Sequence, residues 1–308
     1  MIVTGAGGPA GVAVVRAIRA GGRRVIGCDA DPLAAGIRLA DEGCTVARYD
    51  EPSYIDDLCR VAEKTGAGIL LSTIAEEMPA LAAASPRLSR AGLAMWLPPV
   101  DAVRTCIDKW QFAQAVSRHS LPAPATGLGS SLGVPGPWIV KPRFGRGSRH
   151  VVAVDDADEL RWALARVPEP IAQTRVAGRE FTVDVLVARG GGLAGAVPRW
   201  RDETKAGIST KGETFAHPRL IPLVDALVNA LGLEGPANVQ GFVEPSGEVM
   251  FIELNPRFSG ALPLSLAAGA DLVGEYLRGV DGLPPRPSRL RYRPGVRMTR
   301  YYDELFEG

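Results

Sequence analysis

Two β-rich segments near the C-terminus constrain this chain more than any other feature. Within residues 236–260, two runs rich in strand-forming residues flank Pro245-Ser246-Gly247, a typical turn sequence. This pattern predicts a β-hairpin. Because side chains alternate along a strand, we expect Asn238, Gln240 and Phe242 to share one face of the first strand.

The same alternation applies to the second strand of the hairpin. It predicts one face with Phe251, Glu253 and Asn255, and an opposite face with Met250, Ile252 and Leu254. If residues 245–248 form the loop, Gln240 lies opposite Glu253, and Asn238 lies opposite Asn255. A slip of one residue would send these groups to opposite faces.

One face of the hairpin should therefore gather oxygen donors, with Arg257 just beyond them. The carboxylate of Glu253 and the amides of Gln240 and Asn255 suit a hard cation such as Mg²⁺. A guanidinium suits the charge on a phosphoryl group in transfer. The alternative is a polar outer face of an ordinary antiparallel hairpin, and the rest of the chain decides between the two.

Composition excludes several classes of protein. The chain has 308 residues, of which 46% are apolar and 22% charged, which favours two ordinary globular domains. A formal net charge of +1 gives no reason to expect a nucleic acid or a membrane surface as partner. No signal peptide or membrane-spanning run is evident, so we expect a cytoplasmic protein. Its four scattered cysteines should be free thiols: Cys28, Cys44, Cys59 and Cys106.

Residues 1–107 alternate strand and helix patterns, which predicts an open parallel α/β sheet. We expect strands at residues 2–4, 25–29, 44–47 and 69–72, with helices ending near residue 20 and spanning residues 54–64.

The glycine-rich turn from Gly5 to Gly11, followed by Asp29 at the end of the second strand, matches a dinucleotide-binding pattern in outline. The alternative is a tight turn that needs glycine only for its backbone angles. Glu76 and Glu77 either line a crevice or, as we favour, form the acidic first turn of a helix.

The second half begins with a capped helix at Asp108 and then a loop over residues 127–137. A strand at residues 138–141 delivers Lys141 to a basic glycine loop, which either binds phosphate or is a surface turn. We expect further strands at residues 150–154, 171–173, 180–187 and 296–302, and helices at residues 155–167, 217–231, 259–269 and 272–280. Residues 199–215 predict a charged loop.

The order of four motifs in this half resembles the ATP-grasp superfamily. These motifs are Lys109, the strand with Lys141 and its glycine loop, residues 173–184, and residues 251–257. The resemblance covers residues 108–306 and is closest to the carbamoyl-phosphate-synthase-like branch of carboxylate–amine ligases. It implies an α/β fold, with a Rossmann-like domain at residues 1–107 and a two-lobed α+β ATP-grasp domain at 108–308, whose residues 137–176 form a small mobile lobe over ATP.

The resemblance also implies roles for individual residues. Lys109 and Lys141 would contact the ATP phosphates, and Arg257 with Lys141 would be catalytic. Glu180 would hold the ribose. The metal ligands would be Gln240, Glu253 and Asn255, the closing loop would be Gly145, Arg146, Gly147 and Ser148, and adenine would meet Gln173, Thr174, Arg175 and Val176.

The acid substrate should meet Arg199 or Arg201, with Lys205 and Lys211 as weaker candidates and Ser259-Gly260 nearby. The chain departs from the family pattern at Arg146, where a small residue is usual, and at His150, where glycine is usual. Many relatives carry Glu at the position of Gln240. We therefore expect two Mg²⁺ ions, one of which binds weakly or only with ATP.

Together these features predict an ATP- and Mg²⁺-dependent ligase that forms an amide through an acyl phosphate. Its substrates would be a small, amino-acid-like carboxylate and an amine. Three alternatives stay open: a kinase that stops at phosphoryl transfer, an NAD(P)-dependent oxidoreductase that uses the Gly5–Gly11 turn, and a nucleotide-binding regulator. Apolar surface on the first domain could support a homodimer.

Overall fold

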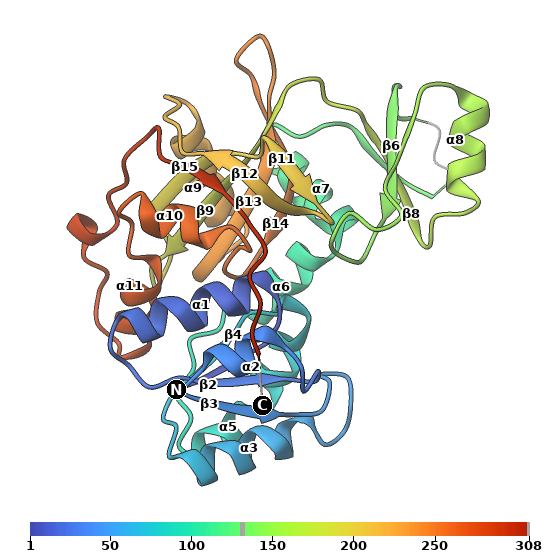
Figure 1. Ribbon diagram of the computed structural model, residues 1–308. Helices are drawn as coiled ribbons and strands as arrows, with labels where there is room; N and C mark the ends of the chain where they lie inside the picture. The colour runs from blue at the N-terminus through green and yellow to red at the C-terminus, as the bar shows by residue number, and fades with distance from the viewer. Residues whose placement is uncertain (130–132, 307–308) are drawn as a thin grey trace.

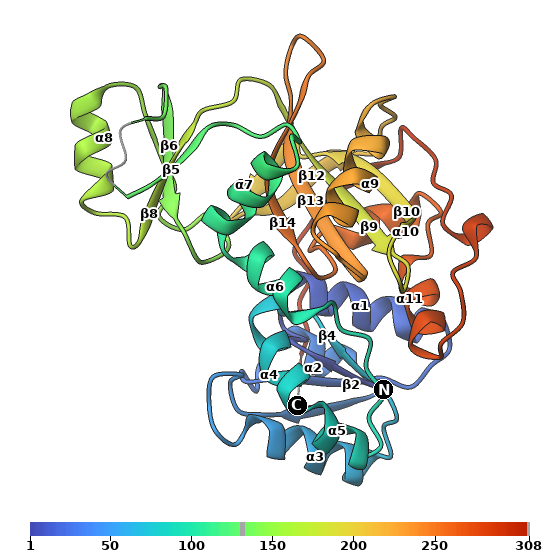
Figure 2. The same cartoon turned by 180° about the vertical axis from the view of Figure 1, so that it is seen from behind.

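The computed structural model of the chain describes residues 1–129 and 133–306. A parallel sheet with its helices forms one end of the molecule, and a larger antiparallel sheet forms the centre (Figure 1). A smaller lobe of strands and one helix projects sideways from the centre, which is also clear from behind (Figure 2). The predicted loop over residues 127–137 falls partly outside the described residues.

The first sheet has the strand order β3-β2-β1-β4 and is entirely parallel, as the sequence predicts. Its strands are β1 (Ile2–Thr4), β2 (Ile26–Asp29), β3 (Glu42–Thr45) and β4 (Leu70–Ser72). Strand β3 begins two residues earlier than expected. The helices are α1 (Pro9–Ala20), α2 (Ala35–Leu39), α3 (Tyr54–Thr65), α4 (Met78–Ala83), α5 (Ser85–Arg90) and α6 (Val100–Ile107).

The central sheet has the order β10-β9-β13-β14 and is antiparallel. It is built from β9 (Arg179–Val187), β10 (Leu193–Trp200), β13 (Gly235–Val243) and β14 (Val249–Asn255). Val183 and Val239 pack on one face in a core shared with α7 (Lys109–Arg118) and α9 (Leu220–Ala230). Because side chains alternate along β9, its polar residues Glu180, Thr182 and Asp184 lie on the opposite face of the sheet, as predicted.

The register of the hairpin β13–β14 is the predicted one at its polar end. Gln240 pairs with Glu253, and Asn238 pairs with Asn255. At the turn the pairing runs differently, because Phe242 pairs with Met250 and Gly241 with Phe251.

A bulge at Ile252 accounts for this change in register. The extra residue goes with a turn that is one residue shorter than expected, because the N–H of Glu244 donates to the Glu248 carbonyl at 2.8 Å and leaves only residues 245–247 between them. The predicted shared face of Phe251 and Glu253 is therefore wrong. Phe251 is fully buried in the core, whereas Ile252 and Glu253 both line a cavity.

The projecting lobe is a four-stranded sheet of order β5-β8-β6-β7 covered by one helix. Its elements are β5 (Thr126–Leu128), β6 (Trp138–Pro142), β7 (Val152–Val154), α8 (Ala157–Leu164) and β8 (Pro170–Thr174). Strand β7 starts two residues later than predicted. Ser148 and His150 have φ angles of 55° and 56°, which a strand cannot accommodate.

The prediction of a charged loop over residues 199–215 is wrong. Residues 203–213 form a hairpin of β11 (Glu203–Lys205) and β12 (Ile208–Glu213), and β12 pairs with β15 (Arg297–Thr299) near the C-terminus. The tight turn of this hairpin is Ala206-Gly207, where both residues have positive φ. Because β15 lies far along the chain, local sequence could not reveal this pairing.

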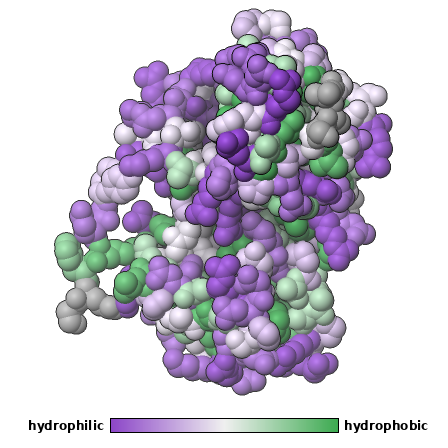
Figure 3. Space-filling view, turned by 90° about the vertical axis from the view of Figure 1, so that its right-hand side faces the viewer, coloured by the Kyte–Doolittle hydropathy of each residue, from purple (hydrophilic) through white to green (hydrophobic). Residues whose placement is uncertain are grey.

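Of the two remaining helices of the central part, the first is shorter than the predicted 259–269 and the second has the predicted bounds. They are α10 (Leu262–Ala267) and α11 (Leu272–Val280). Among the described helices, none is long and apolar enough to cross a membrane. Residues 301–306, the last that the structure describes, stand away from the body in Figure 3 and carry exposed apolar side chains, of which Phe306 is 93% exposed.

Trp96 joins the first sheet region to the central part. Its buried ring stacks on Tyr276 of α11 with 5.4 Å between ring centroids, and the Tyr276 hydroxyl donates to the Trp96 carbonyl at 2.9 Å. Val14 of α1 and Leu277 of α11 belong to the same apolar cluster. These contacts fix the first sheet relative to the central sheet, so a cavity between the two has a defined shape.

The close packing at Trp96 leads to a test of this junction. A Cβ atom added at Gly279 would lie 2.1 Å from the Trp96 ring, which cannot move because it is buried and stacked. We expect Gly279→Ala to lower the free energy of unfolding by about 2 kcal/mol, measured by chemical denaturation. Gly68→Ala is the matched control, since its nearest atom would be 3.9 Å away. Equal stability of the two variants would contradict this packing.

Candidate functional site

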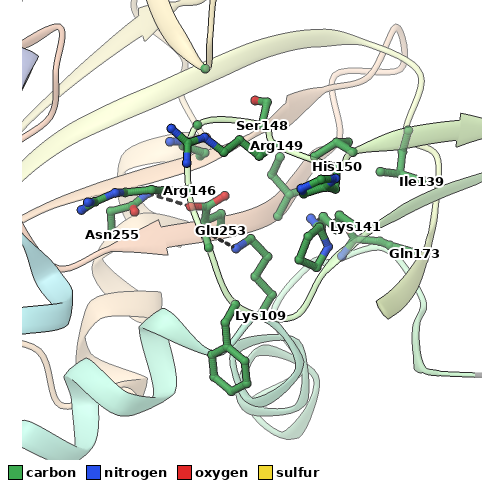
Figure 4. Close-up of a pocket in the computed structure, with 18 of the residues that line it drawn as sticks. Lys109, Ile139, Lys141, Arg146, Ser148, Arg149, His150, Gln173, Glu253 and Asn255 are labelled. Carbon is green, nitrogen blue, oxygen red and sulfur yellow. Dashed lines mark hydrogen bonds between the residues drawn. The ribbon is translucent and has the colours of Figure 1, made fainter. Parts of the chain in front are cut away.

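A cavity of about 740 Å³ opens between the projecting lobe and the polar face of the central sheet. Figure 4 shows its lining, with Glu253 and Asn255 on one side, Lys141 and Gln173 on another, and Arg146, Ser148 and Arg149 along its edge. The structure thus brings every predicted nucleotide and metal residue to one cavity: Lys109, Lys141, Gly145, Arg146, Gly147, Ser148, Gln173, Thr174, Arg175, Val176, Glu180, Gln240, Glu253, Asn255 and Arg257.

Lys141 enters this cavity from the end of β6. Its side chain is buried, and its Nζ donates to Oε1 of Gln173 at 3.0 Å. Burial lowers the pKa of Lys141 to about 8, and the carboxylate of Glu253 opposes that shift. A desolvated ammonium with no acidic hydrogen-bond partner among the described residues is prepared to receive an anion.

Lys109 reaches the same cavity from the start of α7. Asp108 caps this helix by accepting from the backbone N–H groups of Trp110 and Gln111, as the sequence predicts. Both carboxylate oxygens of Asp108 also bind Arg143 at 2.8 and 2.5 Å. Nζ of Lys109 donates to the carbonyl of Gly145 at 2.8 Å, so the helix start and the glycine loop hold each other.

The glycine loop lies against two other parts of the chain. Arg146 pairs with Glu76 of the first sheet region at 3.3 Å. A Cβ atom at Gly207, in the β11–β12 turn, would lie 2.9 Å from Cα of Gly147, so only glycine permits this approach. The positive φ angles of Gly145 and Gly147 give the loop its curvature. The loop is thus held on one side by the ion pair of Arg146 with Glu76 and on the other by the close contact of Gly147 with Gly207.

The polar end of the hairpin forms a network of amides. Nδ2 of Asn255 donates to Glu253 at 3.0 Å and to Asn238 at 3.5 Å, and Nε2 of Gln240 donates to Asn238 at 3.4 Å. These bonds use the nitrogen ends of the amides. The side-chain amide oxygens, Oε1 of Gln240 and Oδ1 of Asn255, and the second carboxylate oxygen of Glu253 have no hydrogen-bond partner among the described residues.

Free carboxylate and carbonyl oxygens at one place are the donor set of Mg²⁺. The described residues contain no group of three or more His, Cys, Asp or Glu suited to a metal ion. A magnesium ion here would thus rely on one carboxylate and neutral oxygens, and phosphate oxygens would complete its shell. The residues present are compatible with this ion in its nucleotide-bound form.

Arg257 lies next to this oxygen cluster and lines the cavity. Its Nη1 donates to the Phe258 carbonyl at 2.9 Å. Burial lowers the pKa of its guanidinium, while the charges of Glu76 and Glu253 act in the opposite direction. Arginine stays protonated in proteins, so a fixed positive charge stands beside the predicted metal residues.

A second cavity of about 730 Å³ adjoins the first and is closed on its far side by the first sheet region. The two cavities share Arg146, Gly147, Arg149, Arg201, Gly207, Gln240 and Arg257. The four predicted substrate residues, Arg199, Arg201, Ser259 and Gly260, all line the second cavity.

Arg199 is almost fully buried at the floor of the second cavity. It binds both oxygens of Asp184 at 3.0 and 3.2 Å and the hydroxyl of Ser259 at 3.0 Å. Its Nη1 is buried and has no hydrogen-bond partner in the part of the chain that the structure describes. Arg201 pairs with Glu180 at 2.8 Å, so the carboxylate predicted to hold ribose also holds an arginine.

The weaker substrate candidates lie elsewhere. Lys211 pairs with Glu203 at 2.8 Å, Lys205 lies over the ring of Tyr302, and neither lysine lines either of the two cavities. They belong to the exposed hairpin that replaces the predicted loop. The interpretation of residues 199–215 as one substrate loop therefore applies only to its first residues.

In the glycine-rich turn after β1, protein groups occupy the space and the N–H group that a dinucleotide would need. Oδ2 of Asp29 accepts from the N–H of Gly7 at 2.7 Å, and a Cβ atom at Gly11 would lie 2.1 Å from the Gly5 carbonyl oxygen. In a dinucleotide site the acidic residue after the second strand faces the ribose. Here Asp29 folds back onto the turn, so the tight-turn interpretation accounts for these glycines.

Sequence reasoning missed part of the lining. Glu76 and Glu77 lie in the first turn of a short 3₁₀ helix (Ala75–Glu77), and Glu76 also lines the cavity, as the alternative interpretation held, whereas Glu77 is buried and accepts from Thr4 and Tyr54. Arg149 also lines both cavities. The three arginines of the basic loop were a signal for Arg149, and the position of Glu76 after the fourth strand was a signal for a crevice, which we ranked below the helix interpretation.

Two protein families match separate parts of the chain. Residues 2–96 match the family described as PylC-like, N-terminal domain. Residues 166–303 match the family described as ATP-grasp in the biosynthetic pathway with Ter operon. The carbamoyl phosphate synthase large chain of Beutenbergia cavernae is 25% identical over 319 residues, which cover 86% of this chain and 28% of the relative. The chain thus spans about a quarter of the length of this relative.

Solved structures share the whole architecture. The biotin carboxylase of Campylobacter jejuni, solved as a β-γ-ATP complex, has a TM-score of 0.76 at 18% identity over 94% of this chain and 73% of that chain. The L-amino acid ligase of Bacillus licheniformis has a TM-score of 0.72 at 17% identity over 95% of this chain and 77% of that chain. At such low identity these likenesses concern the fold, and they confirm the predicted ATP-grasp fold.

The lowered pKa of Lys141 predicts a pH dependence of nucleotide binding. Above about pH 8 the free protein loses the Lys141 proton, so an anionic ligand must bind together with a proton. We expect the Kd for Mg·ATP, measured by calorimetry, to be about tenfold higher at pH 9 than at pH 7. Lys141→Met should bind more weakly at both pH values without this difference. If Lys141→Met kept the full tenfold difference in Kd between pH 7 and pH 9, titration of Lys141 could not be its cause.

Proposed function

Because residues 166–303 match an ATP-grasp family and the fold is the predicted ATP-grasp fold, we propose that this chain is an ATP- and Mg²⁺-dependent ligase of that superfamily. It would join the carboxylate of one small molecule to the amine of another and release ADP and phosphate. The observation that carries this proposal is the junction of the two cavities at Gln240 and Arg257. A nucleotide in the first cavity and an acid in the second would meet at that junction.

The nucleotide would occupy the cavity beneath the projecting lobe. Lys109 and Lys141 would bind its phosphates, with the loop of Gly145, Arg146, Gly147 and Ser148 closing over them. Adenine would meet the end of β8 from Gln173 to Val176, and Glu180 would hold the ribose. Gln240, Glu253 and Asn255 would hold Mg²⁺, which we propose binds as two ions and neutralises phosphate charge.

In the first step a carboxylate oxygen of the acid attacks the γ-phosphorus of ATP. A new P–O bond forms, the bond to the β-phosphate oxygen breaks, and the electron pair leaves with ADP. The products are an acyl phosphate and ADP. Proton transfer contributes little here, so positioning and positive charge provide the catalysis, which Arg257 and Lys141 supply.

In the second step the neutral amine attacks the acyl carbon. The C–N bond forms, the C–O bond to phosphate breaks, phosphate leaves with the electron pair, and the amine proton passes to solvent or phosphate. An acyl phosphate must be protected from water. The glycine loop, which contacts Glu76 and Gly207, is placed to cover the junction.

The carboxylate of the acid would bind at Arg199 and Arg201, close to Ser259 and Gly260. We further propose domain limits at residues 1–107 and 108–308, with residues 137–176 as the mobile lobe. The substrates are small and amino-acid-like, and no nucleic acid or membrane takes part. A homodimer and a cytoplasmic location also remain proposals.

Two other functions make different predictions. A kinase of the same fold would stop at the acyl phosphate or another phosphorylated product. An NAD(P)-dependent oxidoreductase would need the Gly5–Gly11 turn, in which the N–H of Gly7 already donates to Asp29. Thermal stabilisation by Mg·ATP and not by NAD(H) favours the ligase over the oxidoreductase, and the reverse result would overturn it.

An ADP-release screen with amino acids as both acid and amine tests the reaction itself. We expect ADP formation to require both partners, and mass measurement to detect a product lighter by one water than their sum. ADP release with an acid alone, giving a phosphorylated product that no amine consumes, would support the kinase and contradict ligation.

Arg257 provides the most direct test of the catalytic step. We expect Arg257→Ala to lower kcat by about 10²–10³, or about 3–4 kcal/mol of barrier, because no other group replaces a preorganised charge at the transition state. KM for ATP should change much less. The matched control is Arg293→Ala, since this arginine donates to the Ala267 carbonyl outside both cavities. Near-normal turnover of Arg257→Ala would refute its role.

A further inference from the structure

The second cavity has walls of opposite charge. Arg149 and Arg257 lie on the side of the central sheet and glycine loop, and Asp29 and Asp31 lie on the side of the first sheet region. Among the described residues, neither aspartate forms an ion pair. Oppositely charged walls within one cavity favour a ligand, or a pair of ligands, with both signs of charge.

The two aspartates are held in place by backbone groups alone. Oδ2 of Asp29 accepts from Gly7 and Oδ1 from Asp31 N–H, at 2.7 and 3.1 Å, and Oδ1 of Asp31 accepts from Leu33 N–H at 2.9 Å. These neutral donors orient the carboxylates without cancelling their charge. Two like charges two residues apart repel each other, and a cation between them would relieve that repulsion.

The opposite wall provides independent indication of a ligand. Arg199 is only 1% exposed, and its Nη1 has no hydrogen-bond partner in the described part of the chain. A buried donor without an acceptor costs free energy until one arrives. Arg149 forms no ion pair with any described residue. An acid substrate would satisfy this wall, so the aspartates are available for the second substrate.

The cavity lining near the aspartates is apolar. Leu33 is 76% exposed, and Ala34, Ala35 and Ile208 line the same cavity. A chain of methylene groups would cover this surface.

We propose that Asp29 and Asp31 bind a positively charged group of the amine substrate, which is therefore a basic amine with a second cationic group at the far end of a short apolar chain. This inference rests on the proposed ligase function and names the substrate class of its second step. The charge held by the aspartates differs from the reacting nitrogen, because that nitrogen must be neutral to attack the acyl carbon.

Calorimetry on the full chain with Mg²⁺ and a non-hydrolysable ATP analogue tests this subsite. Three probes share a four-carbon chain and differ only at the far end: putrescine is cationic, butylamine is neutral and γ-aminobutyrate is anionic. We expect putrescine to bind most tightly. Asp29→Asn and Asp31→Asn should each raise its Kd about fivefold, the worth of one partly exposed ion pair, and leave the Kd of butylamine unchanged.

Asp31→Asn keeps the one oxygen that accepts from Leu33 N–H, whereas Asp29→Asn keeps only one of the two acceptors that bind the N–H groups of Gly7 and Asp31, so Asp31→Asn is the decisive variant. Asp101→Asn is the matched control, because the Asp101 side chain is 95% exposed and distant from both cavities. Equal binding of putrescine and butylamine, or unchanged putrescine binding in both variants, would overturn the inference. Selective binding of putrescine without product formation would instead contradict the ligase reaction and leave the cation subsite in place.

Discussion

The pairing of β13 with β14 is the interaction on which the site depends. It places Gln240 opposite Glu253 and Asn238 opposite Asn255, and the amide nitrogens then bond to their neighbours. Because those bonds take up the nitrogen ends, the oxygen ends remain for a cation. A slip of one residue would bury Glu253 in the apolar core, so the fold and the chemistry require the same register.

Sequence predicted the elements whose signals are local. The cap at Asp108, the parallel strands of the first sheet and the polar end of the hairpin all follow from neighbouring residues. The bulge at Ile252 was missed, because alternation alone assumes an uninterrupted ladder. The hairpin within residues 203–213 was missed as well, since its charged residues resemble a loop and its pairing strand β15 comes more than 80 residues later.

Sequence also predicted the site residues that belong to one continuous motif. It did not place Glu76 or Asp31 in a cavity with Arg257, because that juxtaposition depends on how the first sheet region is attached to the central part. The attachment rests on the stacking of Trp96 on Tyr276, which are 180 residues apart. Tertiary packing of this kind leaves no local pattern in the sequence.

The strand order of the central sheet sets the distance between Arg199, where we place the acid, and Glu253, where we place the phosphoryl group of ATP. Arg199 pairs with Thr182, Thr182 with Gln240, and Gln240 with Glu253, so these residues form one row across four strands. Three strand spacings separate the ends of the row, about 14 Å. That span can hold a phosphoryl group at Glu253 and an acid at Arg199. Since hydrogen bonding between strands fixes it, the sheet positions both substrates before the glycine loop closes.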